Sequence, residues 1–280
     1  MRYKEFLRLK LADKIPNNIP LPSGFHLVGY VALVHIKNEL VEYSDILGEA
    51  TLDFDSRIKS VAIRTGPTSG IERTPDYRLI VGDTKTVTTH IEAGIKYRID
   101  PLRLTFSGGN KKERIHTASL VQPGDSILDM FACVGQFSIP MAKKGGAEVT
   151  AIELNPLAYR FLLENIRLND VEDNITPILG DCREKHPVRE VNRVVMGYLH
   201  DTHSYLRYAL ESLVEEGGFV HMHIGLRPRD VVGVRKSVEF TCLESGFRPE
   251  IDVRVVKEYA PNVKHYVFDI LLRERSGFGA

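Results

Sequence analysis

Three acidic residues in the second half of the chain each follow a short apolar run, where a bound ligand would be expected. Asp129 ends the run SILD, Glu153 ends EVTAIE, and Asp181 follows ITPILG. In an open α/β sheet the ligand lies beyond the carboxyl ends of the strands, where the strand order reverses. Any one of these acids could also cap a helix N-terminus. An acid at three consecutive strand ends is a more specific pattern than a single one.

The loop after Asp129 indicates the kind of ligand. It reads MFACVG and has one glycine, Gly135, whereas a dinucleotide site requires Gly-x-Gly-x-x-Gly so that a pyrophosphate can approach the helix. The pattern favours S-adenosylmethionine, which has a sulfonium and an amine but no phosphates. Glu153 would accept hydrogen bonds from both ribose hydroxyls. Asp181 would accept from the adenine amino group while the backbone N–H of Cys182 donates to the ring. We expect no metal.

The elements that must position these acids alternate between strand and helix. The pattern predicts strands at 126–129, 148–152, 175–179 and 193–196, and helices at 136–144, 156–169 and 203–215. Three further strands at 219–224, 250–256 and 265–272 end the chain, the last two forming a hairpin. Such alternation predicts right-handed βαβ units and a mostly parallel sheet covered on both faces. A parallel sheet that ends in an antiparallel hairpin is the Rossmann-like layout of class I methyltransferases.

The first hundred residues differ in pattern and predict a small α+β domain. Strand-like runs occupy 25–36, 61–65, 77–81, 86–91 and 97–99, with a helical interval at 41–52 and a short helix at the N-terminus. Proline and glycine clusters separate them. We expect a first domain at 1–115 and a class I methyltransferase-like domain at 116–280.

The composition excludes several classes of protein. Hydrophobic residues make up 43% of the chain, and 37 Lys and Arg balance 37 Asp and Glu, so any nucleic-acid binding must come from a local patch. Three cysteines without a C-x-x-C pair argue against a disulfide scaffold or a cysteine-built zinc site. No uncharged apolar run approaches 18 residues, and the charged N-terminus lacks a signal peptide core. We expect a cytoplasmic protein, and a monomer.

A sharper signal lies between residues 92 and 138. Its marks are Glu92-x-Gly94-Ile95-x-Tyr97, then Asp100, Phe106-Ser107 and Glu113-Arg114. This stretch resembles a family of archaeal and eukaryotic tRNA enzymes that act on guanosine 37, beside the anticodon, and the resemblance extends over nearly the whole chain. One branch of the family methylates guanine N1. The other moves the 3-amino-3-carboxypropyl group of S-adenosylmethionine onto the tricyclic wybutosine precursor.

The end of the fourth strand separates the two branches. The methyltransferases carry an Asn-x-Pro signature there, whereas this chain reads Met196-Gly197-Tyr198 with a downstream His203. This pattern resembles the aminocarboxypropyl branch. The resemblance implies transfer to C7 of 4-demethylwyosine at position 37 of tRNA-Phe, with release of methylthioadenosine. His203 and Tyr198 would then remove the C7 proton or stack on the base.

The resemblance also implies a set of cofactor contacts and a role for the first domain. The family's contacts would carry over to Ser107, Arg114, Glu153, Asp181 and Cys182, with Arg114 and Ser107 holding the carboxylate of the methionine tail. We also expect Asp129, Gly135 and Gly197 to belong to the cofactor site. The first domain would position the RNA and cover the cofactor pocket as a lid. The chain departs from the family where Cys133 replaces the first glycine of Ala-Gly-x-Gly, which we expect to require a negative φ at that residue. Phe-Ser-Gly-Gly-Asn replaces Phe-Ser-Pro-Ala-Asn and adds flexibility beside Ser107.

Two groups of polar residues have less specific readings. His221 and His223 alternate along a predicted strand and are interpreted as packing or solvated histidines. The anticodon loop of the tRNA would need a cationic surface. Candidates are Lys111 and Lys112, then Arg57, Lys59, Arg64, Arg73 and Arg78, and finally Arg227, Arg229, Arg235 and Lys236.

Three alternatives to the aminocarboxypropyltransferase remain open. One is a guanine-N1 methyltransferase acting at position 37 with an altered signature. Another, of a different class, is a non-catalytic tRNA-binding module that retains cofactor affinity. A small-molecule methyltransferase is weaker, because it leaves the first domain without a role.

Overall fold

A computed structural model describes residues 1–274 of the 280-residue chain. The chain divides into two compact units, residues 1–108 and 109–280. This division falls before the boundary expected at 115/116, so the helix α3 (Lys111–Ser119) lies wholly in the second unit. No helix in the described part of the chain is long and apolar enough to cross a membrane.

The first unit contains a four-stranded sheet in the order β1-β2-β3-β4. β2 and β3 are parallel, and the other two neighbouring pairs are antiparallel. β5 and β6 form a separate two-stranded hairpin. The elements are α1 (Tyr3–Lys10), β1 (His26–Val28), β2 (Val31–Val34), the 3-10 helix η1 (Asn38–Tyr43), α2 (Ser44–Phe54), β3 (Ser60–Ser69), β4 (Thr74–Gly82), β5 (Thr88–Glu92) and β6 (Ile95–Ile99).

One predicted strand of the first unit is wrong. The run 25–36 is not continuous but breaks at Gly29 into β1 and β2. Gly29 has a φ of +57°, and a Cβ there would lie 1.9 Å from Oγ1 of Thr88. The chain therefore turns where only glycine fits, and an apolar run that reads as one strand becomes a hairpin. Leu7, Leu40 and Leu47 are buried and form the helical part of this unit's core.

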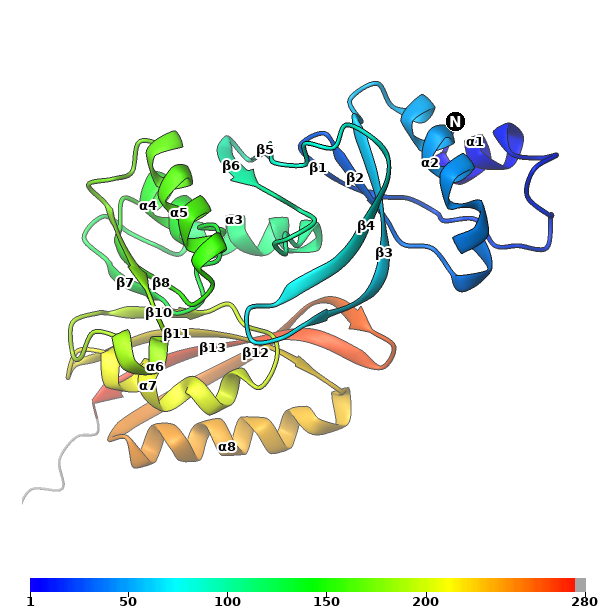
Figure 1. The fold of residues 1–280 in the computed structure, drawn as a ribbon. Coiled ribbons are helices and arrows are strands. Elements are labelled where there is room, and N and C mark those ends of the chain that lie inside the picture. Colours follow the sequence, from blue (N-terminus) through cyan, green and yellow to red (C-terminus); the bar gives the residue numbers. More distant parts are fainter. Residues whose placement is uncertain (275–280) are drawn as a thin grey trace, which may run out of the picture. The chain divides into compact units, whose positions relative to one another are not determined.

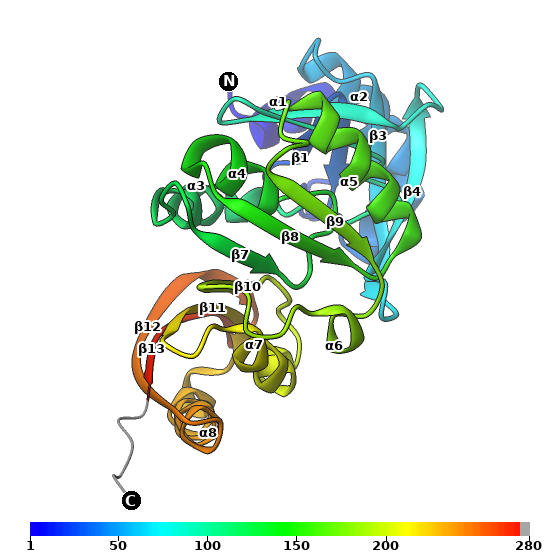
Figure 2. The same ribbon diagram turned by 90° about the vertical axis from the view of Figure 1, so that its left-hand side faces the viewer.

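The second unit is built on a seven-stranded sheet in the order β12-β13-β11-β10-β7-β8-β9 (Figures 1 and 2). β7 to β11 are parallel to one another, whereas β13 is antiparallel to both β11 and β12. The predicted parallel sheet with a terminal antiparallel hairpin is confirmed. Its strands are β7 (Ser126–Asp129), β8 (Glu148–Glu153), β9 (Ile175–Leu179), β10 (Arg193–Met196), β11 (Gly217–Leu226), β12 (Phe247–Ala260) and β13 (Val263–Glu274).

Helices cover the two faces of this sheet (Figures 1 and 2). α3, α4 (Ser138–Gly145) and α5 (Pro156–Leu168) lie on one face, and α6 (Cys182–Lys185), α7 (Leu206–Ser212) and α8 (Val231–Glu244) lie on the other. Short 3-10 helices are η2 (Gly108–Asn110), η3 (Thr202–Tyr205) and η4 (Pro228–Asp230). The helix predicted at 203–215 is therefore η3 followed by α7.

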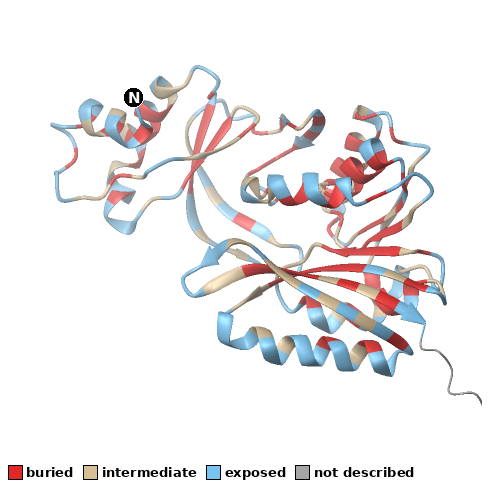
Figure 3. Ribbon diagram, turned by 180° about the vertical axis from the view of Figure 1, so that it is seen from behind, coloured by how far each residue is buried: buried red, intermediate tan, exposed pale blue. Residues whose placement is uncertain are grey.

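The central strands are buried on both faces (Figure 3). Val194, Val195 and Met196 of β10 are all fully buried, as are Phe268 and Ile270 of β13. β-Branched and other apolar side chains suit this position because a strand covered on both faces buries consecutive residues. The covered sheet gives a rigid frame from which the loops at the carboxyl ends of the strands extend.

Candidate functional site

The three acids predicted to share one edge of the sheet do so. β7, β8 and β9 are neighbours, and the chain order reverses between β7 and β10 (Figure 2). Asp129 and Glu153 are the last residues of β7 and β8, and Asp181 follows β9. This edge is therefore the place at which an open α/β sheet binds its ligand.

Asp129 holds the loop that follows β7. Its side chain is fully buried and accepts hydrogen bonds from Oγ of Ser138 at 2.6 Å and from the backbone N–H of Phe131 at 3.3 Å. Burial raises the pKa of Asp129 to about 6, and the hydrogen bond from Ser138 opposes that rise. Both carboxylate oxygens accept hydrogen bonds from this segment, so Asp129 fixes the loop and the start of α4.

Glu153 joins the loops that follow β7 and β8. One carboxylate oxygen accepts from the backbone N–H of Cys133 and the other from that of Asn155, both at 2.7 Å. Asn155 in turn caps α5 by accepting from the backbone N–H of Leu157 at 2.8 Å. Burial raises the pKa of Glu153 to about 7. Each carboxylate oxygen keeps a further lone pair, so Glu153 can still accept hydrogen bonds from a ligand's hydroxyls.

The expected backbone conformation of Cys133 is wrong. Its φ is +51°, in the left-handed region, rather than negative. That conformation accompanies the hydrogen bond from the Cys133 N–H to Glu153, which a glycine at this position would make without strain. Gly135 also has a positive φ, of +90°, and a Cβ there would lie 2.5 Å from Cδ1 of Ile139. The loop is thus tightly packed against α4.

Asp181 is engaged as a helix cap. It accepts from the backbone N–H of Arg183 at 2.9 Å, and its carboxylate also pairs with the Arg183 guanidinium, with Nη2 at 2.5 Å. These hydrogen bonds lower the pKa of Asp181. Cys182, the first residue of α6, is buried. Asp181 therefore caps the N-terminus of α6, as the sequence pattern also allowed.

Arg114 is hydrogen-bonded to the loop that follows β7. It is only 2% exposed, and its Nη1 donates to Oε1 of Gln136 at 3.2 Å. Gln136 lies in the loop between β7 and α4, whose backbone binds Glu153. Ser107 is half-buried and lies at the end of the first unit.

Lys257 of β12 is a candidate that the sequence reasoning missed. A Cβ on Gly109 would lie 2.5 Å from its Nζ. Burial, and then the charge of Arg114, lower the pKa of Lys257. Two cations thus lie near the start of α3 and suit a carboxylate. No local pattern marks Lys257, because its neighbour Gly109 is far away in the sequence.

The end of β10 carries an aromatic cluster. Tyr198 is stacked on Phe131, with ring centroids 5.2 Å apart and an interplanar angle of 27°, and meets Tyr205 edge-on at 6.2 Å. A Cβ on Gly197 would lie 3.3 Å from the ring of Phe137. His203 is 39% exposed, and its Nε2 lies 3.5 Å from Oδ1 of Asp201. Tyr198 and His203 therefore share the β10–α7 segment but make different contacts.

His221 and His223 are packing histidines and are not solvated, being 3% and 1% exposed. Nδ1 of His221 lies 2.6 Å from Oδ1 of Asp269, and its Nε2 lies 2.7 Å from Nη1 of Arg193. Nδ1 of His223 lies 3.0 Å from Nε2 of His265. Burial lowers the pKa of both His221 and His223, that of His223 to about 3. These side chains form a buried polar network beneath the site.

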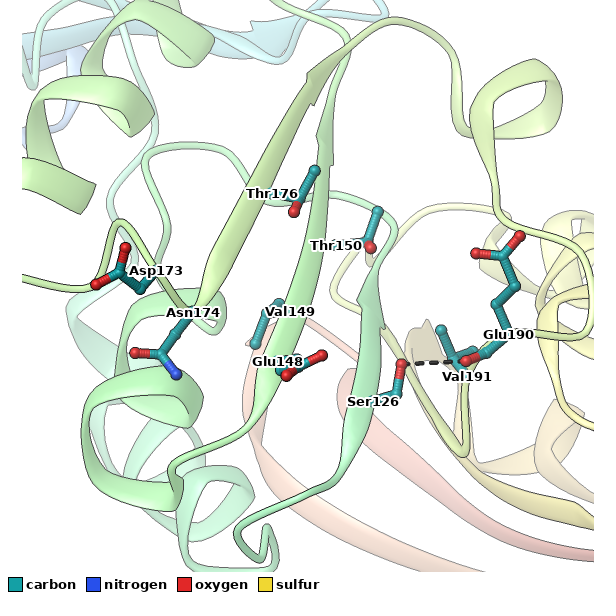
Figure 4. A pocket seen from close by; sticks show the side chains of 9 residues that line it. All are labelled: Ser126, Glu148, Val149, Thr150, Asp173, Asn174, Thr176, Glu190 and Val191. Atoms are coloured by element: carbon teal, nitrogen blue, oxygen red, sulfur yellow. Dashed lines mark hydrogen bonds between the residues drawn. The ribbon is translucent and has the colours of Figure 1, made fainter.

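A shallow polar hollow of about 220 Å³ lies at the opposite edge of the same strands (Figure 4). It opens at the amino ends of β7 and β8, and acidic and hydroxyl side chains line it. Its lining is Ser126, Glu148, Val149, Thr150, Asp173, Asn174, Thr176, Glu190 and Val191. Its acidity disfavours phosphates and carboxylates, and it is not the edge at which Asp129 and Glu153 end.

The basic residues proposed for RNA contact lie on several elements. All are exposed except Arg73, which is half-buried, and Arg57 is paired with Asp55 at 2.6 Å. Arg227 and Arg229 lie at the start of η4, directly after β11, whereas Arg235 and Lys236 lie on α8. The cationic group at 227–236 is therefore divided between the η4 segment and α8.

The doubly covered sheet, its terminal hairpin and the acids at the ends of β7 and β8 define a class I methyltransferase-like protein. The TYW2 N-terminal domain matches residues 5–86, and the TRM5/TYW2 methyltransferase domain matches residues 88–248. The chain belongs to the TRM5/TYW2 family.

Relatives from both branches of this family are similar to the chain. It is 35% identical to the tRNA(Phe) (4-demethylwyosine(37)-C(7)) aminocarboxypropyltransferase of Pyrococcus horikoshii, over 96% of this chain and 95% of that one. It is 34% identical to the tRNA (guanine(37)-N(1))-methyltransferase Trm5b of Pyrococcus abyssi, over 89% of this chain and 74% of that one.

Solved structures from both branches are also similar to the chain. The structure of P. horikoshii TYW2 in complex with MeSAdo has a TM-score of 0.82 at 32% identity, covering 98% of this chain and all of that one. The complex of aTrm5 and tRNALeu has a TM-score of 0.83 at 29% identity, covering 98% of this chain and 78% of that one.

Proposed function

We propose that this protein transfers the 3-amino-3-carboxypropyl group of S-adenosylmethionine to C7 of 4-demethylwyosine at position 37 of tRNA-Phe and releases methylthioadenosine. The end of β10 carries the proposal. It has Gly197 and Tyr198 where the methylating branch carries Asn-x-Pro, and Tyr198 stacks on Phe131. Identities of 35% and 34% to the two branches are nearly equal, so the support comes from these residues.

The residues at the carboxyl edge fit the group donor. Glu153 would accept from the ribose hydroxyls, and Cys182 and Asp181 would face the adenine. Asp129 and Gly135 would keep the intervening loop in place, and Gly197 would leave room at the end of β10. A relative of the same fold has been solved with MeSAdo, which is consistent with this assignment.

The two cations near the start of α3 would hold the methionine tail. Arg114 donates to Gln136 and so is already oriented, and Lys257 lies near enough for its pKa to be lowered by Arg114. A carboxylate between Arg114 and Lys257 would relieve the repulsion between these two cations. Fixing this carboxylate sets which carbon of the sulfonium faces the acceptor.

The reaction would be a displacement at the γ-carbon of that tail. C7 of the precursor attacks the γ-carbon, the bond between sulfur and the γ-carbon breaks, and its electron pair stays on sulfur as a neutral thioether. The C7 proton then leaves to a base, for which His203 and Tyr198 are the candidates. The group in line, roughly 3 Å from the nucleophile, is the one that reacts. Because the tricycle is electron-rich, a strong base is less necessary than for guanine N1.

The acceptor would be the anticodon loop of tRNA, held by exposed cations such as Arg227 and Arg229. The complex of aTrm5 with tRNALeu supports a tRNA partner for this fold. Binding to phosphates releases counterions, so affinity should fall with added salt.

Analysis of the reacted nucleoside and of the by-product tests the proposal. Precursor tRNA incubated with the protein and S-adenosylmethionine should gain the mass of an aminocarboxypropyl group and yield methylthioadenosine. Gain of a methyl group on unmodified guanosine 37, with release of adenosylhomocysteine, would assign the protein to the methylating branch. The relative from P. abyssi belongs to that branch. Tight binding of both ligands with neither product would indicate a binding module.

A further inference from the structure

Four rings lie in a row along the carboxyl edge of the sheet, and the proposed reaction uses only the first part of it. Phe131 and Tyr198 are stacked at 5.2 Å, whereas Tyr198 meets His200 edge-on at 5.9 Å and His200 meets Tyr259 edge-on at 5.8 Å. The first three residues come from the loops after β7 and β10, and Tyr259 comes from the end of β12. The row therefore connects the candidate acceptor site to the tip of the terminal hairpin.

The outer pair of rings is exposed yet held in place. His200 is exposed and Tyr259 is 39% exposed, and Nε2 of His200 lies 3.1 Å from the Tyr259 hydroxyl. The Tyr259 ring rests on β11, since a Cβ on Gly225 would lie 3.7 Å from its Cδ1. The backbone N–H of Gly225 donates to the carbonyl of Leu199 at 2.8 Å, which ties the loop of His200 to the same strand. An exposed aromatic pair fixed by hydrogen bonds suits stacking on a planar ligand.

Cations adjoin this pair. β11 ends at Leu226, so the exposed Arg227 and Arg229 follow shortly after Gly225, the residue on which Tyr259 rests. Leu226 is opposite Lys264 of β13. Lys264 is paired with Glu258 at 3.2 Å, and Nε of Arg229 lies 3.8 Å from Asp230. Exposed aromatic rings beside a cationic track are the combination that binds single-stranded nucleic acid, in which bases stack and phosphates pair with the cations.

We propose that the exposed face of Tyr259, whose ring His200 holds edge-on, is a stacking surface for a nucleotide next to the modified base in the anticodon loop. This inference rests on the proposed function, because it requires that the base at position 37 lies against Tyr198 in the same row. The neighbouring nucleotide then reaches the next rings along the row, with its phosphate toward Arg227. The surface thus selects an unpaired loop over a duplex, whose bases remain stacked on one another.

Three variants test this surface with the full chain and an anticodon stem-loop that carries 2-aminopurine beside position 37. Tyr259→Ala should weaken RNA binding about tenfold or more and abolish the fluorescence quenching that stacking causes. Tyr259→Phe keeps the ring and should bind within about twofold of wild type. Phe240→Ala removes an exposed ring on α8, 64% exposed, and should change nothing.

Two readouts separate this inference from the proposed function. Unchanged affinity and quenching in Tyr259→Ala overturn the stacking surface, whatever the wild-type protein transfers. Weaker binding without loss of quenching also overturns it. Unchanged affinity for S-adenosylmethionine would then indicate an RNA contact other than stacking, whereas reduced affinity would indicate a folding defect. If the wild type transfers no aminocarboxypropyl group yet quenches through Tyr259, the proposed function fails and the surface stands.

Discussion

Arg254 and Glu113 form a bidentate ion pair that joins β12 to α3, with both nitrogen–oxygen distances at 2.5 Å. The Glu113 side chain is 3% exposed. Nε of Arg254 also donates to Asp269, which accepts from His221, so a single guanidinium connects α3 to the buried polar network. Glu113 directly precedes Arg114, so the pair fixes the helix that carries the proposed tail anchor.

Replacing Arg254 with methionine should therefore destabilise the protein strongly. Glu113 would be left as a buried carboxylate without its partner, which typically costs about 3–5 kcal/mol. The measurement is the free energy of unfolding in urea. Arg254→Met combined with Glu113→Gln should recover part of the loss, because the double variant buries no unpaired charge.

Arg57 offers a matched control for the Arg254 variant, since its pair with Asp55 lies at the surface. Arg57→Met should leave the unfolding midpoint unchanged, because exposed pairs contribute little. Equal effects of the Arg254 and Arg57 variants would contradict the role given to the buried pair.

Binding of S-adenosylmethionine should strengthen as the pH rises from 6 to 8. Burial raises the pKa of Glu153 to about 7, and ribose hydroxyls donate to its ionised form, so binding favours deprotonation. Below that pKa the affinity should change by up to about tenfold per pH unit, and above it the affinity should level off. Calorimetry across this range, in buffers of different ionisation enthalpy, should also detect proton release.

Glu153→Gln should remove most of this pH dependence, and a profile as steep as that of wild type would assign it to another group. The stability of the ligand-free protein should have the opposite pH dependence and fall as the pH rises. Because the folded state raises the pKa of Glu153 from 4.5, its favourable contribution at low pH is lost as the pH rises through about 7.

Arg114→Met should weaken S-adenosylmethionine but not methylthioadenosine. Only the former has the carboxylate that Arg114 is proposed to hold, and a hydrogen bond to a charged group contributes about 1.5–3 kcal/mol, or roughly tenfold to a hundredfold in affinity. Lys257→Met should act in the same direction with a smaller effect. Equal weakening of both ligands would show instead that the pocket has collapsed.

Cys133→Gly should leave the unfolding free energy unchanged or raise it by up to about 1 kcal/mol. The residue has a φ of +51°, where a side chain costs roughly 1–2 kcal/mol and glycine costs little, although the packing of the sulfur is lost. Cys133→Val, with a branched Cβ at the same φ, should lower the stability. A glycine variant less stable than the valine variant would contradict this reading of the loop.

The strands of the second unit could be predicted closely, whereas three of its α-helices, α3, α6 and α8, could not. β7, β9 and β10 have the predicted bounds, because buried parallel strands are short apolar runs. α3 was not predicted, since its buried side chains are Glu113, Arg114, Thr117 and Ala118 and give no apolar periodicity. α8 was also missed, because it buries only Val238 and Cys242 and contains Gly233.

Long-range contacts account for what the sequence could not show at the site. His221 is opposite Asp269 because β13 lies between β11 and β12, and no local pattern specifies that order. The same holds for Lys257 beside Gly109. The sign of φ at Cys133 depends on the hydrogen bond to Glu153, a contact between two loops that the residue type alone does not predict.

The carbon that reaches the RNA tests the central claim most directly. Precursor tRNA-Phe would be incubated with the protein and S-adenosylmethionine labelled, in separate reactions, in the carboxyl carbon or in the methyl carbon. The proposed transferase places the carboxyl label in the RNA and leaves the methyl label in methylthioadenosine. Methyl label in the RNA, with none from the carboxyl carbon, would contradict the account.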